Sequence, residues 1–229
     1  IQFDDKGSVE YAVFDGVVEQ ALGLGIEGAS FITAFPRRDA LRAATVIKPG
    51  ARLDEGMARL VAQREEIGLI LTGDIQVSGR GYLITTRALS AGNDGATLYR
   101  LEAIADDKAA LLETVGTLAG KVRTALGDTA VPSRGPAASE TFTAASLGAA
   151  KAYTEGQELN WAGKSDEAIA KYEEAIRLDP DMGRAYSGIA AQYQNTGRRA
   201  DADRYYNEAL TRIDRMTDRE KFRTRGGYF

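Results

Sequence analysis

The sequence predicts an α+β protein in two parts, a mixed α/β module with an antiparallel meander followed by an all-α array of helical hairpins. Two features favour this class. Short runs with β-strand composition, separated by glycine-rich turns, occupy the middle of the first half. A repeat with a period of 34 residues occupies the last third, and such a period is typical of stacked helical hairpins.

Residues 1–126 are expected to form the α/β module. Its first elements follow from hydrophobic spacing and from cap and turn residues. They are, in order, a strand end at 1–3, an amphipathic helix at 16–24 with Asp15 as its N-cap, a strand at 31–35, a helix at 38–47, and a surface helix that begins at Leu53 and uses Met57, Leu60, Val61 and Ile67 as its apolar face.

Three strands are predicted next, at 69–77, 82–90 and 97–104, with hairpin turns at 78–81 and 92–95. Apolar and more polar residues alternate in the first of them, as a half-buried meander requires. The sheet therefore has one face to cover.

A helix from about Asp107 to Leu126 is expected to cover that face, and it closes the first domain. Its apolar residues recur at helical spacing and form one stripe. The stripe consists of Leu111, Val115, Leu118, Val122 and Ala125. The segment 127–143 is rich in Pro and small residues, which predicts a linker.

Composition argues against several classes of function. The 229 residues include no His and no Cys, so the usual general base and the commonest metal ligands are missing. We therefore expect no enzyme activity, no catalytic residues, no cofactor and no metal. The net charge is −4 with Lys and Arg interleaved among acids, which predicts no nucleic-acid partner. No apolar run approaches the length of about 18 residues that a membrane span needs, so no direct membrane contact is expected.

The segment Gly23-Leu24-Gly25-Ile26-Glu27-Gly28 matches the G-x-G-x-x-G pattern of dinucleotide sites. In such a site the glycines follow a strand and open a helix, so that phosphate meets free N–H groups. Here they are expected to follow a helix and precede the strand at 31–35. We interpret them as a helix end and a turn.

The 34-residue period rests on five identities. Small residues recur where two helices must approach closely, and Pro180 follows the second helix, where it ends that helix. Gly163, Ala168, Tyr172, Glu174 and Ala175 recur at Gly197, Ala202, Tyr206, Glu208 and Ala209. This pattern resembles the tetratricopeptide repeat (TPR), and it implies that residues 144–229 hold two repeats and the start of a third.

In such repeats the first helix of each pair lines a binding groove, so the resemblance implies a polar binding face with aromatic anchors. Its candidate residues are Tyr153, Gln157, Asn160, Trp161, Arg184, Ser187, Gln194 and Asn195. The Lys and Asn clamp of chaperone-binding repeats is not matched, since Tyr153 and Gln157 stand there. The alternative is that these side chains stay solvated or contact the chain itself. If they bind a partner, Tyr153→Ala with Arg184→Ala should weaken capture and leave the melting temperature nearly unchanged.

The two halves together resemble one bacterial family. The strings that carry the resemblance are 13–22, 71–75, 185–190 and 215–229. The family is the regulatory half of membrane-anchored serine/threonine protein kinases, in which an α/β module like the TolB amino-terminal or FlgO domain precedes TPRs. The resemblance implies an upstream kinase domain, one membrane span, and this portion beyond it as a sensor or scaffold. An extracytoplasmic (periplasmic) location is implied, with a cytoplasmic one as the alternative.

The function expected from these observations is that of a non-catalytic module for protein–protein interaction and signal sensing within a larger signalling protein. The expected ligand is a protein or peptide, and self-association is open. The alternative is that the α/β domain senses a small ligand or an envelope component for a transcriptional regulator, with the repeats as scaffold or dimerisation surface.

Overall fold

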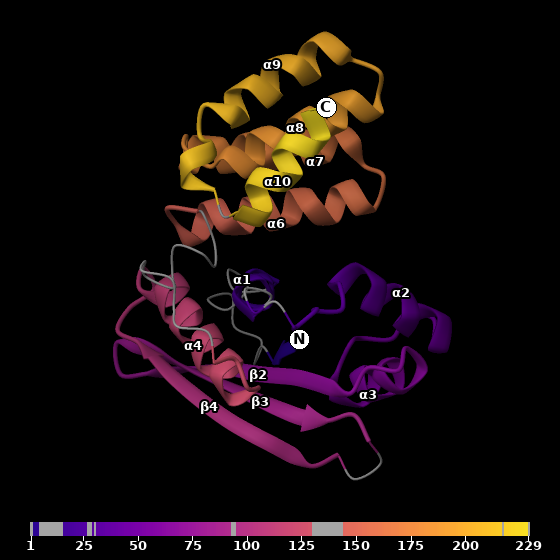
Figure 1. Cartoon of the computed structure of the whole chain (residues 1–229), viewed down its shortest axis with the longest axis vertical. Helices are drawn as coiled ribbons and strands as arrows, with labels where there is room; N and C mark the ends of the chain where they lie inside the picture. The colour runs from indigo at the N-terminus through magenta and orange to yellow at the C-terminus, as the bar shows by residue number, and fades with distance from the viewer. Residues whose placement is uncertain are drawn as a thin grey trace. The chain divides into compact units, whose positions relative to one another are not determined.

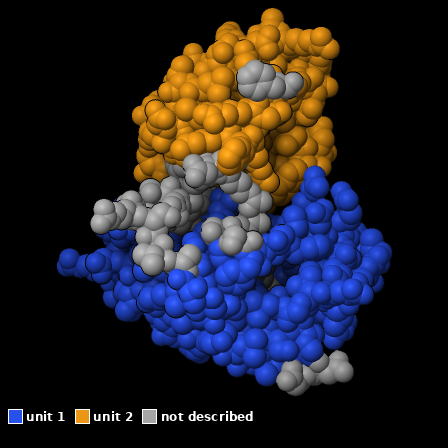
Figure 2. Space-filling view, viewed as in Figure 1, with its two compact units in different colours: residues 1–138 blue, residues 139–229 orange. Residues whose placement is uncertain are grey.

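The computed structural model describes residues 2–4, 16–26, 29, 31–92, 95–129, 144–216 and 218–228. The chain divides into two compact units, residues 1–138 and residues 139–229 (Figure 2). The first unit combines a four-stranded sheet with helices, and the described residues of the second unit form helices only. The α+β class predicted from the sequence is confirmed.

The sheet has the strand order β1-β2-β3-β4 (Figure 1). β1 (Gln2–Asp4) runs parallel to β2 (Leu69–Ser78), whereas β2, β3 (Gly81–Ser90) and β4 (Thr97–Ala105) form the predicted antiparallel meander. A two-residue turn joins β2 to β3. Gly79 begins this turn with φ of 65°, a left-handed conformation that glycine adopts without steric penalty.

Two helices, α1 (Val17–Ile26) and α4 (Leu111–Ala125), cover one face of the sheet (Figure 1). The predicted apolar stripe of α4 is confirmed, since Leu111, Val115 and Leu118 are fully buried. On the face of the sheet that lies against these two helices, Ile84 is also fully buried. The core of the first unit lies in this layer.

The other face of the sheet is covered at one end. α2 (Arg37–Ile47) packs against α3 (Glu55–Arg64), and α3 reaches β2. The Asp54 carboxylate caps α3 by accepting a hydrogen bond from the Met57 N–H at 2.8 Å. Ala62 on α3 packs with Ile70 and Leu89 at the start of β2 and the end of β3. This face is open along β4, where Leu98, Arg100, Glu102 and Ile104 are exposed.

Several predictions for the first unit are wrong. Residues 31–36 are a turn and extended coil, not a strand, and the Phe31 side chain is 58% exposed. Within the described residues no strand lies beside this segment, so these β-prone residues have no strand with which to pair. Gly23 and Gly25 lie inside α1 instead of after it, because burial of Ile26 extends the helix. Leu60 is 47% exposed and is no core residue.

Other predictions fall on residues that the structure leaves out. Asp15, the predicted N-cap, and Glu27 and Gly28 of the glycine segment lie outside the described residues, as do Asn93 and Asp94 of the second turn. The predicted linker at 127–143 begins at Gly127, which follows α4 with φ of 99°. Residues 130–143 of that linker are likewise outside the described part of the chain.

The second unit consists of successive helices that pack as hairpins (Figure 1). They are α6 (Leu147–Trp161), α7 (Ser165–Leu178), α8 (Gly183–Asn195), α9 (Arg199–Leu210), the short 3-10 helix η2 (Ile213–Arg215), and α10 (Asp218–Tyr228). α6 packs on α7, and α8 packs on α9. Gly163 and Gly197 follow the first helix of each hairpin with φ of 75° and 77°, so the same turn conformation occurs in both hairpins.

Tyr172 lies between successive hairpins and explains why small residues recur at the helix crossings. A Cβ on Gly156 of α6 would lie 2.7 Å from the Tyr172 ring, and one on Gly188 of α8 would lie 3.0 Å from it. Ala168 and Ala175, on the same helix as Tyr172, are fully buried. The small residues at these crossings therefore make room for a large ring between helices.

Candidate partner-binding face

Tyr153 on α6 and Arg184 on α8 belong to the predicted binding face, but both are buried, each 5% exposed. The Arg184 guanidinium lies over the Tyr153 ring, 4.7 Å from its centroid. Arg184 Nε also donates to Oε1 of Glu220 on α10 at 2.9 Å, and Glu220 is buried as well. The three side chains form a buried cluster, here called the Arg184 cluster, which links α6, α8 and α10.

The charges in the Arg184 cluster support one another. Burial raises the pKa of the Tyr153 hydroxyl, and the positive charge of Arg184 only partly opposes the rise. Burial by itself lowers the pKa of Arg184, but the interactions with Tyr153 and Glu220 outweigh it, and the net change is upward. At neutral pH the guanidinium is therefore charged, and the phenol is neutral.

The burial of both side chains argues against the expectation that Tyr153→Ala with Arg184→Ala would leave the melting temperature nearly unchanged. Both side chains are interior, and removal of Arg184 would leave Glu220 buried without this cation. A partner that met this surface would touch α10 before it touched either residue. The sequence-based interpretation placed them on an open face because it did not include packing of α10 against the first two hairpins.

Two further members of the predicted face are half-buried and lie beside the Arg184 cluster. Gln157 Nε2 donates to the Tyr153 hydroxyl at 2.7 Å and so helps to position it. Ser187 Oγ donates to the Arg184 backbone carbonyl at 3.0 Å. This bond lies within α8 and satisfies the Ser187 hydroxyl, but it does not hold the Arg184 side chain.

The remaining four members lie at the carboxyl ends of α6 and α8, and they include the exposed ones. Asn160 Oδ1 accepts a hydrogen bond from Gln192 Nε2 at 2.8 Å, which ties the two helix ends together. Gln194 Oε1 accepts from the Tyr206 hydroxyl at 3.0 Å. Trp161 is 41% exposed. Gln194 and Asn195 are exposed as well.

Sequence reasoning missed two residues of this region. Glu220 lies one period after Tyr186, which is half-buried. The 34-residue period could therefore have indicated that position 220 packs against its neighbours, but it did not indicate Arg184 as the partner. Gln192 is 1% exposed, yet it lies one period after Glu158, which is exposed, so no pattern marked it as buried.

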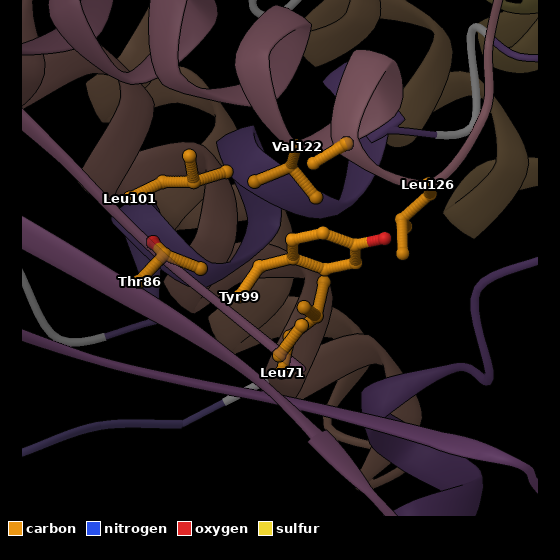
Figure 3. A pocket seen from close by; sticks show the side chains of 8 residues that line it. Leu71, Thr86, Tyr99, Leu101, Val122 and Leu126 are labelled. Carbon is orange, nitrogen blue, oxygen red and sulfur yellow. The ribbon is translucent and has the colours of Figure 1, made fainter. Parts of the chain in front are cut away.

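The first unit contains a shallow crevice where α4 ends over the sheet (Figure 3). It encloses about 180 Å³ of empty space, part of it open to solvent, and in this conformation it is too narrow to hold a water molecule. Its walls are almost entirely apolar. They consist of Leu71, Thr86, Ala88, Tyr99, Leu101, Val122, Ala125 and Leu126. The alternative function, a small-ligand sensor, stays a prediction that this crevice does not favour.

A comparison with protein families matches part of the second unit. The model of the TPR repeat family matches residues 156–197, which span the end of α6, all of α7 and α8, and the turn that follows. The chain contains a tetratricopeptide repeat. Neither the curated proteins nor the solved structures yield a match. Hereafter the second unit is called the TPR unit, and TPRs generally bind protein partners.

The described residues offer neither a metal site nor a membrane-spanning helix. No group of three or more Asp and Glu side chains there could hold a metal ion. No described helix is both long and apolar enough to cross a bilayer.

Proposed function

We propose that the TPR unit recruits a protein or peptide partner through the exposed carboxyl ends of α6 and α8. The observation that carries this proposal is the position of Trp161, a large aromatic side chain that stays 41% exposed beside polar groups already set by hydrogen bonds. Exposed Trp side chains next to polar groups are typical anchors of protein interfaces. Asn160, Gln194 and Asn195 complete this surface.

The chemistry of the surface favours a neutral, extended segment of a partner. Asn and Gln amides both donate and accept hydrogen bonds, so they suit the N–H and C=O groups of a peptide backbone. Arg184 does not supply a charge for the partner, because Glu220 engages it. We therefore expect selection for an apolar side chain that packs on Trp161.

The test uses the complete chain and a random peptide library displayed on phage. Selected peptides are titrated against the protein, and binding is followed by the fluorescence of Trp161, the one Trp in the sequence. Trp161→Ala and Asn195→Ala are expected to weaken binding about tenfold or more, as is usual at an interface anchor, with no loss of folding. Because Trp161→Ala removes the fluorophore, the variants are compared by calorimetry.

Phe31→Ala is the matched control, since it removes an exposed aromatic side chain from the first unit. It is expected to bind the peptides like the unaltered chain. If the library yields no peptide, or if the Trp161 and Asn195 variants bind the selected peptides unchanged, this surface is not the binding face.

We also propose that this chain is the regulatory portion of a larger signalling protein, a bacterial membrane-anchored serine/threonine kinase. The resemblance of the segments 13–22, 71–75, 185–190 and 215–229 supports it. The test is the sequence of the full native polypeptide. A kinase domain and an apolar span before this chain would support the placement, and a DNA-binding domain in their position would contradict it.

A further inference from the structure

β4 forms an outer edge of the sheet (Figure 1). Within the described residues it pairs with β3 on one side and with no strand on the other. Backbone groups of successive residues alternate between the two sides of an antiparallel strand. The two-residue turn fixes which residues of β3 direct their backbone groups towards β2 and which towards β4, and the β3–β4 register carries this alternation into β4. Arg100, Glu102 and Ile104 therefore direct their N–H and C=O groups outward. In agreement, the Lys121 side chain reaches the Glu102 carbonyl at 3.1 Å.

The side chains of this edge are exposed on the open face of the sheet. Leu98 and Ile104 are large apolar residues with exposures of 49% and 64%. Arg100 and Glu102 lie between them, with exposures of 62% and 45%, and pair with each other at 2.8 Å. An edge of this length with exposed apolar side chains is a template for pairing with another strand.

The order of these side chains is self-complementary. If a second copy of β4 pairs antiparallel about a two-fold axis at Leu101, Arg100 faces Glu102 of the other copy, and Glu102 faces Arg100. The same register brings Leu98 beside Ile104 of the other copy. Opposite charges and apolar pairs directly across an antiparallel ladder are stabilising, and a two-fold axis makes every such contact twice.

Neighbouring registers are disfavoured by charge. A two-fold axis at Arg100 would place two arginines opposite each other, and an axis at Glu102 would do the same with two glutamates. Like charges directly opposite each other are destabilising. Axes at Arg100, Leu101 and Glu102 all pair residues whose backbone groups face outward, so hydrogen bonding permits all three registers and charge selects the one at Leu101.

Two interactions within each chain must break when the strands pair. The Arg100–Glu102 ion pair within the strand exchanges for two pairs between strands, which conserves the charge interactions. The Lys121 ammonium leaves the Glu102 carbonyl, and as an exposed flexible side chain it returns to water. A register shift opposite Ala88 and Leu89 affects only the Leu98 end of the strand.

We propose that β4 is a homodimerisation edge, at which two copies of this chain join their sheets in antiparallel register about Leu101. This interface lies in the first unit and is independent of the partner proposed for the TPR unit.

Sedimentation velocity of the complete chain, over about a hundredfold range of concentration, tests the proposal. The species is expected to shift from 24.6 kDa towards twice that mass as concentration rises. Arg100→Glu and Glu102→Arg each place like charges opposite each other twice and should weaken association about tenfold or more. Combining the two changes restores opposite charges and should restore association. Arg80→Glu, in the exposed β2–β3 turn, is the matched control and should leave association unchanged.

A cross-link tests the register itself, since the chain has no Cys of its own. Residues 100 and 102 of two copies would be a hydrogen-bonded pair with Cα atoms about 5.5 Å apart, within reach of a disulfide. A mixture of Arg100→Cys and Glu102→Cys chains should therefore cross-link faster than either chain alone. A monomer at every concentration, association insensitive to the charge changes, or no preference for the mixed cross-link would overturn the proposal.

Discussion

Tyr172 shows how single residues set the spacing of the TPR unit. Its ring is 2% exposed and lies against positions 156 and 188, where the absence of a side chain lets the helices approach. A close-packed interior responds to even one added methyl group, because neighbours have little room to move. The small residues of the period therefore have an energetic role that can be measured.

We expect Gly156→Ala to lower the free energy of unfolding of the TPR unit by about 1–3 kcal/mol, since its Cβ would lie 2.7 Å from the Tyr172 ring. Gly148→Ala, on the same helix, is the control. Its Cβ would make an ordinary contact at 3.5 Å with Leu178, so the better helix propensity of Ala should leave stability unchanged or slightly higher. Urea unfolding followed by circular dichroism measures both. Equal effects would show that the crossing tolerates a methyl group.

At the scale of elements, α10 is held to the hairpins by packing and by the Arg184 cluster. Gly227 lies close to the Tyr206 side chain, since a Cβ at Gly227 would be 2.7 Å from the Tyr206 hydroxyl. Arg184 joins α8 to α10 through Glu220 and lies over Tyr153 on α6. One cation thus connects α6, α8 and α10, so its loss should destabilise more than its own helix.

Arg184→Ala is expected to cost the TPR unit about 3–5 kcal/mol, because it leaves the Glu220 carboxylate buried without this cation. Replacing both residues by Met should recover much of that loss, since no charge is then left buried. Lys164→Ala breaks an exposed pair with Glu167 and should change stability little. The measurement is thermal unfolding by circular dichroism. A small effect for Arg184→Ala would mean that α10 does not bury the cluster in solution.

At the scale of the whole molecule, the buried tyrosines couple stability to alkaline pH. Burial is the main cause that raises the pKa of each of five tyrosines in the TPR unit above the ordinary value of 10.0. They are Tyr153, Tyr172, Tyr186, Tyr205 and Tyr206. A raised pKa in the folded state means that the folded chain keeps protons that the unfolded chain has lost.

The tyrosine contribution to the stability of the TPR unit should therefore be constant below pH of about 10 and should fall as the pH rises above it, since the unfolded state then binds fewer protons. Urea unfolding at a series of pH values, with tyrosinate absorbance as a second signal, measures the fall. Tyr172→Phe removes one of the raised groups and should make the decline shallower. A stability that is flat or rises above this pH would contradict the assignment.

Several features of this protein were predictable because their causes are local. The period of 34 residues places Gly163 and Gly197 at equivalent helix ends, and the spacing of Leu111, Val115 and Leu118 defines the face of α4. The absence of a strand at 31–35 was not predictable, because a strand needs a neighbouring strand and composition does not show whether one is there. The candidate binding face was only partly predictable, since exposure depends on which helix comes next.

By itself, the sequence determined the α+β class, the repeat and the meander, because helical and strand periodicities and turn residues act over a few neighbours. Only the tertiary structure decided that Tyr153 and Arg184 are interior, since the Glu220 side chain on α10 completes their cluster. It also decided that β4 is an edge, with Leu98 and Ile104 in solvent. Burial and edges depend on contacts between residues far apart in the chain, which no local pattern contains.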